Sequence, residues 1–518
     1  MTIHQSPHPR VTLPDVSITE LMFQGLGQDD DRPVLVDGPS GRQVTAGALR
    51  SGIMALAGGL TARGFGRGAT VALMAPNIPE YVTVYHAVAW AGGTVTTINP
   101  TYTAAEVAHQ LRDSGATLLI TVPPFAETAR AAAAEAGVSE VAAIGEAEGL
   151  TPLAALMGDP ITAQVPVDLD RDVMVLPYSS GTTGMPKGVM LSHRNLVANV
   201  VQFQAVRPVA PGEWTVGFLP FFHIYGMTVL ANVYLAAGGG VVTLPRFDLA
   251  EFLRLCQAWR TPQAFIVPPV ALALAKHPMV DEYDLSALGY AFSGAAPLGA
   301  DLAGAVEARL GIRCEQGYGM TEMSPASHVT QKDRGVPGHV GPAMPSTECR
   351  IVDPETGEDL GAGQEGELWV RGPQVMLGYL NNDAATAAVL DGDGWLRTGD
   401  IAVVGEDGQL RIADRLKELI KVKGFQVAPA EVEAALVAHP KIADAGVVGV
   451  ADEEAGEVPL AFVKPADGAE VTLEEVQAHL AGRLASYKQV RRIEVVDEIP
   501  KSASGKILRR LLRDRLAG

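Results

Sequence analysis

Short apolar segments with the length of β-strands alternate with helix-like segments through most of the first 400 residues. Residues 70–74 and 117–122 fit strands, whereas residues 82–91 and 127–136 fit helices. Further strand-like runs cover residues 173–177, 214–219, 240–244 and 264–267. This order favours mostly parallel sheets with helices packed on their faces. We therefore expect an α/β fold for this part of the chain.

Two later stretches depart from this alternation. Residues 349–353 and 366–370 alternate apolar and polar side chains and are separated by turn residues, which indicates a small antiparallel β subdomain. After the charged run at residues 414–418, the chain has a smaller α+β pattern. Its expected helices cover residues 429–439 and 473–484, and its expected strands cover 447–450 and 461–463. The sequence thus predicts a large N-terminal domain, residues 1–414, and a small C-terminal domain, residues 415–518.

Length and charge narrow the class of protein. A chain of 518 residues exceeds what one hydrophobic core usually holds, so two or more domains are expected. A net charge of −19 disfavours binding to nucleic acid or to acidic membranes. No run of about 18 apolar residues predicts a membrane span. Three cysteines without metal-ligand spacing fit a reducing compartment, so a cytoplasmic protein is expected.

The segment from Ser179 to Gly188 carries the strongest chemical signal. It reads Ser-Ser-Gly-Thr-Thr-Gly-Met-Pro-Lys-Gly and follows a strand-like run. Small residues let backbone N–H groups approach an anion, hydroxyls add donors, and Lys187 adds a positive charge. The spacing differs from the common P-loop because Gly188 follows the lysine. The segment predicts a polyphosphate site, with a flexible surface linker as the alternative.

A second group of motifs offers ligands for a nucleotide and a metal ion. Residues 316–322 read Gln-Gly-Tyr-Gly-Met-Thr-Glu. Tyr318 could stack on a purine, Thr321 could donate to a phosphate, and Glu322 could hold Mg²⁺. Asp400 could accept hydrogen bonds from both hydroxyls of a ribose. Ordinary glycine turns remain the alternative for both motifs.

Three more motifs could bind or move a substrate. His223 and Tyr225 lie among aromatic residues and could form the wall and gate of a pocket. Residues 293–298 are small and could admit a flat acyl group, with Pro297 at the start of a helix. Lys506 lies on a loop before an expected helix at residues 507–516, where a charge can be delivered and withdrawn. The alternatives are a core histidine and a solvated basic helix face. That face would comprise Arg509, Arg510, Arg513 and Arg515.

In this order, the motifs resemble those of the adenylate-forming superfamily, which includes acyl-CoA synthetases, luciferases and the adenylation domains of peptide synthetases. The resemblance runs from about residue 20 to residue 512. Residues 414–431 are most similar to 4-coumarate:CoA ligases and related acyl-CoA ligases. They read Asp-Arg-Leu-Lys-Glu-Leu-Ile-Lys-Val-Lys-Gly-Phe-Gln-Val-Ala-Pro-Ala-Glu.

The resemblance implies a role for each matching residue. Catalytic roles would fall to Lys506, Lys421, Gln426, His223 and Thr321. ATP or AMP would be bound by Ser179, Ser180, Gly181, Thr182, Thr183, Gly184, Lys187, Gln316, Gly317, Tyr318, Thr321, Asp400, Arg415 and Lys506. Coenzyme A would contact Arg246, Lys423 and Gly424, Mg²⁺ would bind Glu322, and Lys417 would be the hinge of the C-terminal domain. The acyl group would lie among His223, Tyr225, Gly226, Phe292, Gly294, Ala295, Gly317 and Gly319.

The implied reaction joins a cinnamate- or 4-coumarate-like carboxylate to coenzyme A. ATP would first convert the acid to an acyl-adenylate, with Lys506 bridging the carboxylate and the α-phosphate, and the coenzyme A thiol would then displace AMP. Phe292 offers no hydrogen bond to a ring hydroxyl, so cinnamate, benzoate-type and medium-chain fatty acids stay open as substrates. An acyl-AMP ligase that loads a carrier protein, a luciferase-type oxygenase and a catalytically silent acyl-nucleotide sensor also stay open as functions. The expected ligands are small molecules, namely the acid, ATP, Mg²⁺ and coenzyme A, and the chain is expected to be a monomer or a homodimer.

Overall fold

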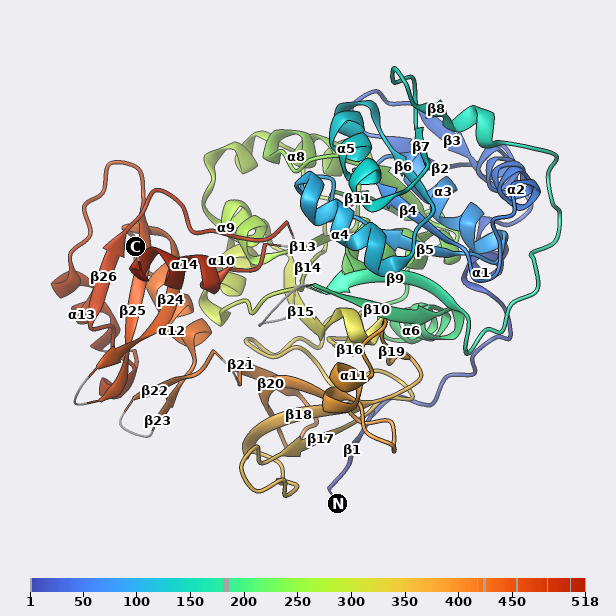
Figure 1. Cartoon of the computed structure of the whole chain (residues 1–518). Helices are drawn as coiled ribbons and strands as arrows, with labels where there is room; N and C mark the ends of the chain where they lie inside the picture. The colour runs from blue at the N-terminus through green and yellow to red at the C-terminus, as the bar shows by residue number, and fades with distance from the viewer. Residues whose placement is uncertain are drawn as a thin grey trace.

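Layered sheets and helices make up the N-terminal part of the chain, and a smaller domain at the C-terminal end lies beside it (Figure 1). This computed structural model describes residues 2–179, 186–416, 418–422, 425–452, 455–481, 483–503 and 505–517, without the side chains of residues 426 and 517. Residues 180–185 of the predicted phosphate loop and the predicted hinge, Lys417, lie outside the described residues. The α/β fold with a separate C-terminal domain is confirmed.

The first sheet has the strand order β19-β10-β9-β5-β4-β6-β7-β8. The strands are β4 (Thr70–Met74), β5 (Thr94–Thr97), β6 (Leu118–Thr121), β7 (Glu140–Ala143), β8 (Thr151–Pro152), β9 (Val173–Ser179), β10 (Lys187–Ser192) and β19 (Gly378–Tyr379). Strands β9, β5, β4, β6 and β7 pair in parallel, and β10 turns back antiparallel to β9.

Apolar residues on both faces explain why this sheet is covered on both sides. Met74 packs in a cluster with α4 (Ala104–Ser114) and α5 (Ala126–Ala136), whereas Leu73 belongs to the main core with α2 (Ala46–Ala62) and α3 (Pro79–Trp90). Because successive side chains of a strand point to opposite faces, an uninterrupted apolar strand needs helices on each side. The helix α1 (Ile18–Leu26) extends the main core.

Two further sheets complete the α/β part. One has the order β11-β12-β2-β3 and the other the order β13-β14-β15-β16. Their strands are β2 (Pro33–Asp37), β3 (Gln43–Thr45), β11 (Trp214–Gly217), β12 (Gly240–Thr243), β13 (Gln263–Ile266), β14 (Tyr290–Ser293), β15 (Arg313–Gly319) and β16 (Ala326–Val329). The associated helices are α6 (His193–Val206), the π-helical segment η3 (Gly226–Asn232), α7 (Val233–Ala236), α8 (Leu249–Ala258), α9 (Pro268–Lys276) and α10 (Ala300–Leu310).

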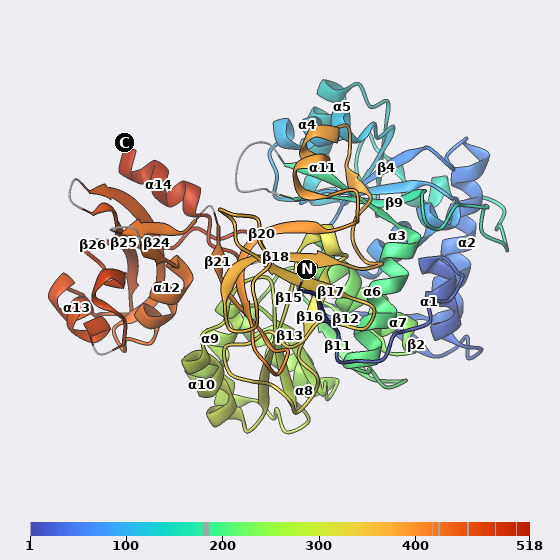
Figure 2. The same cartoon turned by 90° about the horizontal axis from the view of Figure 1, so that it is seen from below.

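The predicted β subdomain is present as an antiparallel sheet with the order β1-β17-β18-β20-β21. Its strands are β1 (His4–Gln5), β17 (Glu348–Val352), β18 (Glu365–Arg371), β20 (Leu396–Val404) and β21 (Leu410–Arg415), and α11 (Asp383–Val389) precedes β20. Strand β21 ends just before the predicted hinge and leads toward the C-terminal domain, as Figure 2 shows.

The C-terminal domain has a core of its own. Its sheet has the order β23-β22-β25-β24, with β26 on β25. The strands are β22 (Ile420–Val422), β23 (Phe425–Val427), β24 (Ile442–Asp452), β25 (Gly456–Pro465) and β26 (Arg492–Val495), and the helices are α12 (Pro429–Val437), α13 (Leu473–Ala481) and α14 (Arg509–Ala517). Val432, Val447 and Val476 meet in this core, which is separate from the main one.

Two alternatives that the sequence left open are wrong at one residue each. Pro297 does not start a helix: α10 begins at Ala300, because the side chain of Gln316 bonds both backbone groups of Leu298 and holds this segment outside the helix. Arg509 is not part of a solvated face, since it is buried and ion-paired with Glu418 and Glu433. The three cysteines are free and buried. Among the described residues, no helix is long and apolar enough to cross a membrane.

Candidate functional site

Three strands bring Tyr318, Asp400 and Arg415 together. Tyr318 lies near the carboxyl end of β15, and Asp400 faces Arg415 across the ladder between β20 and β21. The Tyr318 hydroxyl donates to Oδ2 of Asp400 at 2.6 Å, and Nε of Arg415 lies 3.3 Å from Oδ1. Burial, followed by the charge of Asp400, raises the pKa of Tyr318 far above its usual range, so the phenol remains a donor. The arrangement offers a ring, a carboxylate and a cation to one ligand.

A second carboxylate lies beside Lys187. Glu322 belongs to the short helix η5 (Thr321–Met323) and is buried, and its Oε1 accepts a hydrogen bond from the Tyr379 hydroxyl at 2.8 Å. Nζ of Lys187 lies 4.9 Å from the centre of the Tyr379 ring. Tyr379 can hold both groups because β19 pairs with β10, the strand that begins at Lys187. Tyr379 was not singled out from the sequence, and no motif there marks it.

Lys187 also faces Ser179 across the ladder between β9 and β10. The paired part of the two strands therefore ends at these two residues, and residues 180–185 between them lie outside the described part of the chain. Thr321, at the start of η5, is partly exposed. The described flank of the predicted phosphate loop thus lies in the same region as Glu322, since Lys187 and Glu322 both contact Tyr379.

Lys506 reaches this region from the C-terminal domain. Gly505, with φ +78°, lies so close to Val267 that a Cβ there would be 3.2 Å from Cγ2 of that valine. The ammonium group of Lys506 interacts with the charges of Arg415, Asp400 and Glu418. Burial, reinforced by the positive charge of Arg415, lowers the pKa of Lys506 to about 8. The loop therefore places a readily deprotonated amine within electrostatic reach of the Asp400 carboxylate.

His223 faces the same amine. Burial first, and then the charge of Lys506, lowers the pKa of His223 to about 4, so its imidazole is neutral at pH 7. Its Nδ1 accepts a hydrogen bond from the backbone N–H of Tyr225 at 3.3 Å. A neutral ring held by one weak bond can change its orientation without moving a charge.

The predicted acyl-binding residues are partly brought together. The Tyr225 hydroxyl donates to the backbone carbonyl of Phe292 at 3.2 Å, and a Cβ on Gly294 would lie 3.1 Å from the Tyr225 ring. A Cβ on Gly317 would lie 2.5 Å from Cζ of Phe292, so the ring of Phe292 covers Gly317. Ala295 follows in the left-handed region, with φ 68°.

Three other predicted site residues have structural contacts. A Cβ on Gly226 would meet the backbone carbonyl of Pro220, and a Cβ on Gly319 would meet that of Pro325. These glycines therefore permit close packing of the chain on itself. The amide of Gln316 donates to Leu298 O and accepts from Leu298 N, both at 3.1 Å, and thereby holds the segment after β14.

The remaining predicted residues lie apart from this cluster or outside the description. Arg246 is exposed ahead of α8, and Lys421 is exposed on β22. Lys423 and Gly424 lie outside the described residues, as does the side chain of Gln426. Gly505 is one contact between the domains, and Gly299 is another, because a Cβ there would lie 3.1 Å from Cβ of Ala434. Nζ of Lys276 donates to Val437 O at 3.3 Å, and the exposed pair Arg483–Asp301 spans 3.1 Å.

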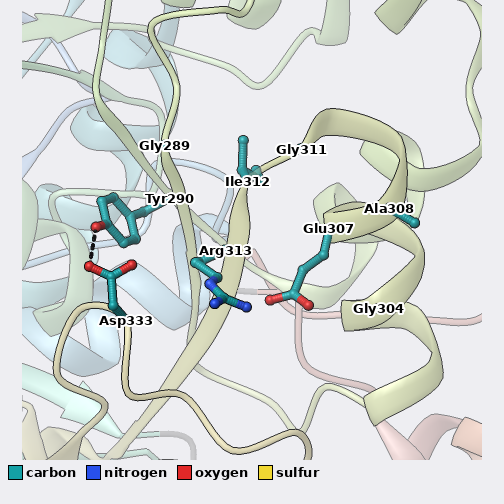
Figure 3. A pocket seen from close by; sticks show the side chains of 9 residues that line it. All are labelled: Gly289, Tyr290, Gly304, Glu307, Ala308, Gly311, Ile312, Arg313 and Asp333. Carbon is teal, nitrogen blue, oxygen red and sulfur yellow. Dashed lines mark hydrogen bonds between the residues drawn. The ribbon is translucent and has the colours of Figure 1, made fainter.

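A surface hollow of about 650 Å³ lies at the other end of the β14–β15 pair (Figure 3). It is lined by Tyr290, Glu307, Arg313 and Asp333, and the Tyr290 hydroxyl donates to Asp333 at 2.8 Å. Tyr290 and Arg313 begin their strands, whereas Ser293 and Gly319 end them. Ligands of open α/β sheets bind at the carboxyl ends of the strands. We therefore place the functional site at the opposite edge from this hollow.

Comparisons with known proteins identify the family of the chain. Residues 24–380 match the AMP-binding enzyme family, and residues 431–506 match the AMP-binding enzyme C-terminal domain. The chain is 40% identical to 4-coumarate–CoA ligase 5 of Oryza sativa subsp. japonica, over 99% of this chain and 97% of that protein. ATP-bound MatB from Rhodopseudomonas palustris superposes with a TM-score of 0.88 at 31% identity, over 96% of this chain and 99% of that one. The anthranilate CoA ligase AuaEII in complex with anthranoyl-AMP gives a TM-score of 0.89 at 25% identity, over 98% of each chain.

Proposed function

The chain belongs to the AMP-binding enzyme family, within the adenylate-forming superfamily and close to 4-coumarate–CoA ligases, and on that premise we propose that it joins a ring-bearing acid of the cinnamate class to coenzyme A. One observation carries the proposal: Lys506, delivered by the C-terminal domain, lies among the charges of Arg415 and Asp400. A cation at that point can join a carboxylate to a phosphate.

The chemistry explains why such a cation is needed. A carboxylate is a poor electrophile because its charge repels nucleophiles and oxide is a poor leaving group. Attack of a carboxylate oxygen on the α-phosphorus of ATP forms the new P–O bond and expels pyrophosphate, which leaves an acyl-adenylate. The ammonium of Lys506 neutralises the two anions as they approach. Correct placement of the reactants alone can contribute about 7–11 kcal/mol.

The other residues would then hold the nucleotide. Tyr318 would stack on adenine, and Asp400 with Arg415 would bind the ribose. Both oxygens of Asp400 already have partners, Tyr318 and Arg415, so the ribose hydroxyls would share or displace these hydrogen bonds. Lys187, Ser179 and Thr321 would contact the phosphates, together with residues 180–184 and the backbone at Gln316 and Gly317. This division of roles is supported by the common location of Tyr318, Asp400, Glu322 and Lys187 on neighbouring elements.

The residues present fit a magnesium ion bound mainly by the substrate. Within the described part of the chain, no group of three or more His, Cys, Asp or Glu residues could hold a metal by itself. Mg²⁺ commonly binds one or two carboxylates and completes its shell with phosphates and water. Glu322 is a buried carboxylate beside Lys187 and would be that ligand, and the ion would supply charge neutralisation on the phosphates.

We propose that the second half-reaction follows a rotation of the C-terminal domain about a hinge near Lys417, between an N-terminal domain 1–414 and a C-terminal domain 415–518. The polar contacts between α9, α10 and that domain are exposed, and exposed ion pairs contribute about 0–1 kcal/mol each. Rotation would withdraw Lys506 and bring Lys421 and Gln426 to the acyl-adenylate, with His223 moving aside. Coenzyme A would lie against Arg246, Lys423 and Gly424, and its sulfur would attack the acyl carbon and release AMP.

The acid is proposed from the relatives and from the pocket wall. The matched plant enzyme is named for 4-coumarate, and the adenylate in the AuaEII structure is anthranoyl-AMP. Tyr225, Phe292, Gly294 and Gly317 provide a ring-lined, narrow wall beside Ala295. An aromatic acid such as cinnamate fits these surfaces. We further propose a reducing, cytoplasmic location for the protein, which its free, buried cysteines support.

The test is an acid panel in a pyrophosphate-release assay, followed by addition of coenzyme A. We expect release that depends on cinnamate-type acids, and acyl-CoA and AMP in equal amounts once coenzyme A is present. Lys506→Ala should lose adenylation and still form acyl-CoA from supplied acyl-AMP. Transfer only to a carrier protein, oxygen uptake, or no response to any acid would each contradict the proposal.

A further inference from the structure

A buried ion pair lies beneath the proposed acyl pocket. Arg207, the residue after α6, is fully buried and pairs with Glu315 of β15, whose side chain is 2% exposed. The guanidinium also donates to Thr330 O at 3.0 Å. Within the described part of the chain, Nε of Arg207 and Oε1 of Glu315 have no hydrogen-bond partner. The pair is therefore buried and incompletely satisfied.

A buried ion pair of this kind contributes little to the net free energy of folding. Removing two charges from water costs several kcal/mol per ion, and apolar residues of similar volume are often equally or more stabilising. The presence of the pair is better explained if it holds a neighbouring side chain in place. That side chain is Phe292.

The guanidinium packs on the ring of Phe292. Cζ of Arg207 lies 4.7 Å from the centre of the Phe292 ring, and 5.5 Å from that of Tyr290. Phe265, Phe292 and Glu315 are register partners across β13, β14 and β15, so their side chains form one row on the face of the sheet that Arg207 covers. Guanidinium groups prefer the negative faces of aromatic rings.

The same ring closes off Gly317. Gly317 is two residues beyond Glu315 on β15 and faces the same side, where Cζ of Phe292 lies 2.5 Å from the position of a Cβ. Phe203 and Phe265 pack edge-on or tilted against Phe292, with ring centres 6.0 and 5.7 Å away. The ring is thus held between aromatic neighbours and the buried cation.

We propose that the Arg207–Glu315 pair is a positioning device that holds the Phe292 ring across Gly317 and so sets the depth of the acyl pocket. The inference rests on the proposed function, and it names the substrate more narrowly. With the ring fixed, the pocket ends at Gly317, and the preferred acids are ring acids without a substituent at the para position. Arg207 acts through Phe292 and does not touch the acid.

The experiment compares kcat/KM for 4-methoxycinnamate with kcat/KM for cinnamate. The test variant replaces the pair by apolar residues, Arg207→Met with Glu315→Leu. Arg207→Lys serves as a milder variant, because it keeps the charge and loses the flat guanidinium. The matched control is Arg350→Met with Asp359→Leu. The two side chains of that ion pair lie 2.6 Å apart and are also largely buried. Arg350 also packs on aromatic rings, those of Trp369 and Trp395.

We expect the selectivity ratio to rise about tenfold in the test variant, equivalent to about 1.4 kcal/mol, mainly through the KM for 4-methoxycinnamate. Arg207→Lys should shift it in the same direction, and the control should leave it unchanged. If the test variant does not fold, Arg207→Lys decides the question. An unchanged ratio in folded variants, or an equal change in the control, would overturn the inference. If the wild-type protein fails to release pyrophosphate with every acid tested, that result would contradict the proposed function instead.

Discussion

The low pKa of Lys506 leads to a prediction about the adenylation step. Burial and the neighbouring charge of Arg415 lower this pKa from the ordinary 10.5 to about 8, against the opposing pull of Asp400 and Glu418. The fall corresponds to about 3 kcal/mol for holding the ammonium form at this position. The free enzyme should therefore lose its catalytic cation at a pH where ordinary lysines keep theirs.

The protonation of Lys506 determines how adenylation and domain docking change with pH. At pH 7 about 90% of the amines are charged, and at pH 9 about 10%, so kcat/KM for adenylation should fall about tenfold per pH unit above pH 8. Below pH 8 Lys506 is protonated in both the docked and the undocked state of the C-terminal domain. The cost of burying the ammonium then opposes docking in full. Between pH 8 and 10.5 the undocked state binds more protons, so docking becomes more favourable as pH rises. Catalysis and docking should respond to alkali in opposite directions.

The assay is acid-dependent exchange of pyrophosphate into ATP from pH 6 to pH 10. Lys506→Arg supplies a side chain that stays charged throughout, so any residual exchange should lack the alkaline decline. Lys501→Arg is the matched control, because Lys501 lies on the same loop and pairs with Asp444 at 2.5 Å instead of entering the site. A decline centred near pH 8 that persists in Lys506→Arg would refute the assignment to Lys506.

Three further predictions concern the nucleotide, the acid and stability. Asp400→Asn should raise the KM for ATP about tenfold or more, because charged hydrogen bonds contribute about 1.5–3 kcal/mol; an unchanged KM in pyrophosphate release would contradict the ribose role. Gly317→Ala places a Cβ against the Phe292 ring, so the KM for the acid should rise while that for ATP stays close to wild type; equal effects on both would show a general disturbance. Burial lowers the pKa of His86, His193 and His328 to about 3 or 4, so the unfolded state binds more protons below pH 6.5. Urea unfolding should therefore show stability falling by up to about 1.4 kcal/mol per pH unit for each histidine as the pH drops from 6.5 toward 4, and equal stability at pH 7 and pH 5 would be inconsistent with neutral burial of His86, His193 and His328.

Local patterns were sufficient for most of the elements. The strand at Thr70–Met74 and the start of α12 at Pro429 coincide with the predicted bounds, because apolar runs and an N-terminal proline are local signals. The antiparallel pairing of β17 with β18 also follows from alternation and turns. By contrast, β1 pairs with β17 across more than 340 residues of sequence, and nothing in the short polar segment near His4 predicts that partner.

Contacts between distant residues explain what the sequence did not provide. Proline is common at the start of a helix, but at Pro297 a glutamine from the next strand holds the following residue outside the helix. Arg509 looks like one of several surface arginines, yet α14 turns it toward Glu433, and its burial depends on packing that no spacing reveals. Tyr379 and Arg207 could be singled out only from their contacts in the structure, with Glu322 and Glu315. The motif residues, in contrast, were chosen for the chemistry of their own side chains or, for the glycines, for the lack of one, and their roles stay predictions.

The most direct test of the adenylate route uses a cinnamate whose carboxylate oxygens are labelled with ¹⁸O, in a complete reaction with ATP and coenzyme A. If the acid attacks the α-phosphorus, one labelled oxygen per turnover appears in AMP and none in pyrophosphate. Labelled phosphate formed together with ADP, or unlabelled AMP accompanying acyl-CoA, would contradict activation through an acyl-adenylate.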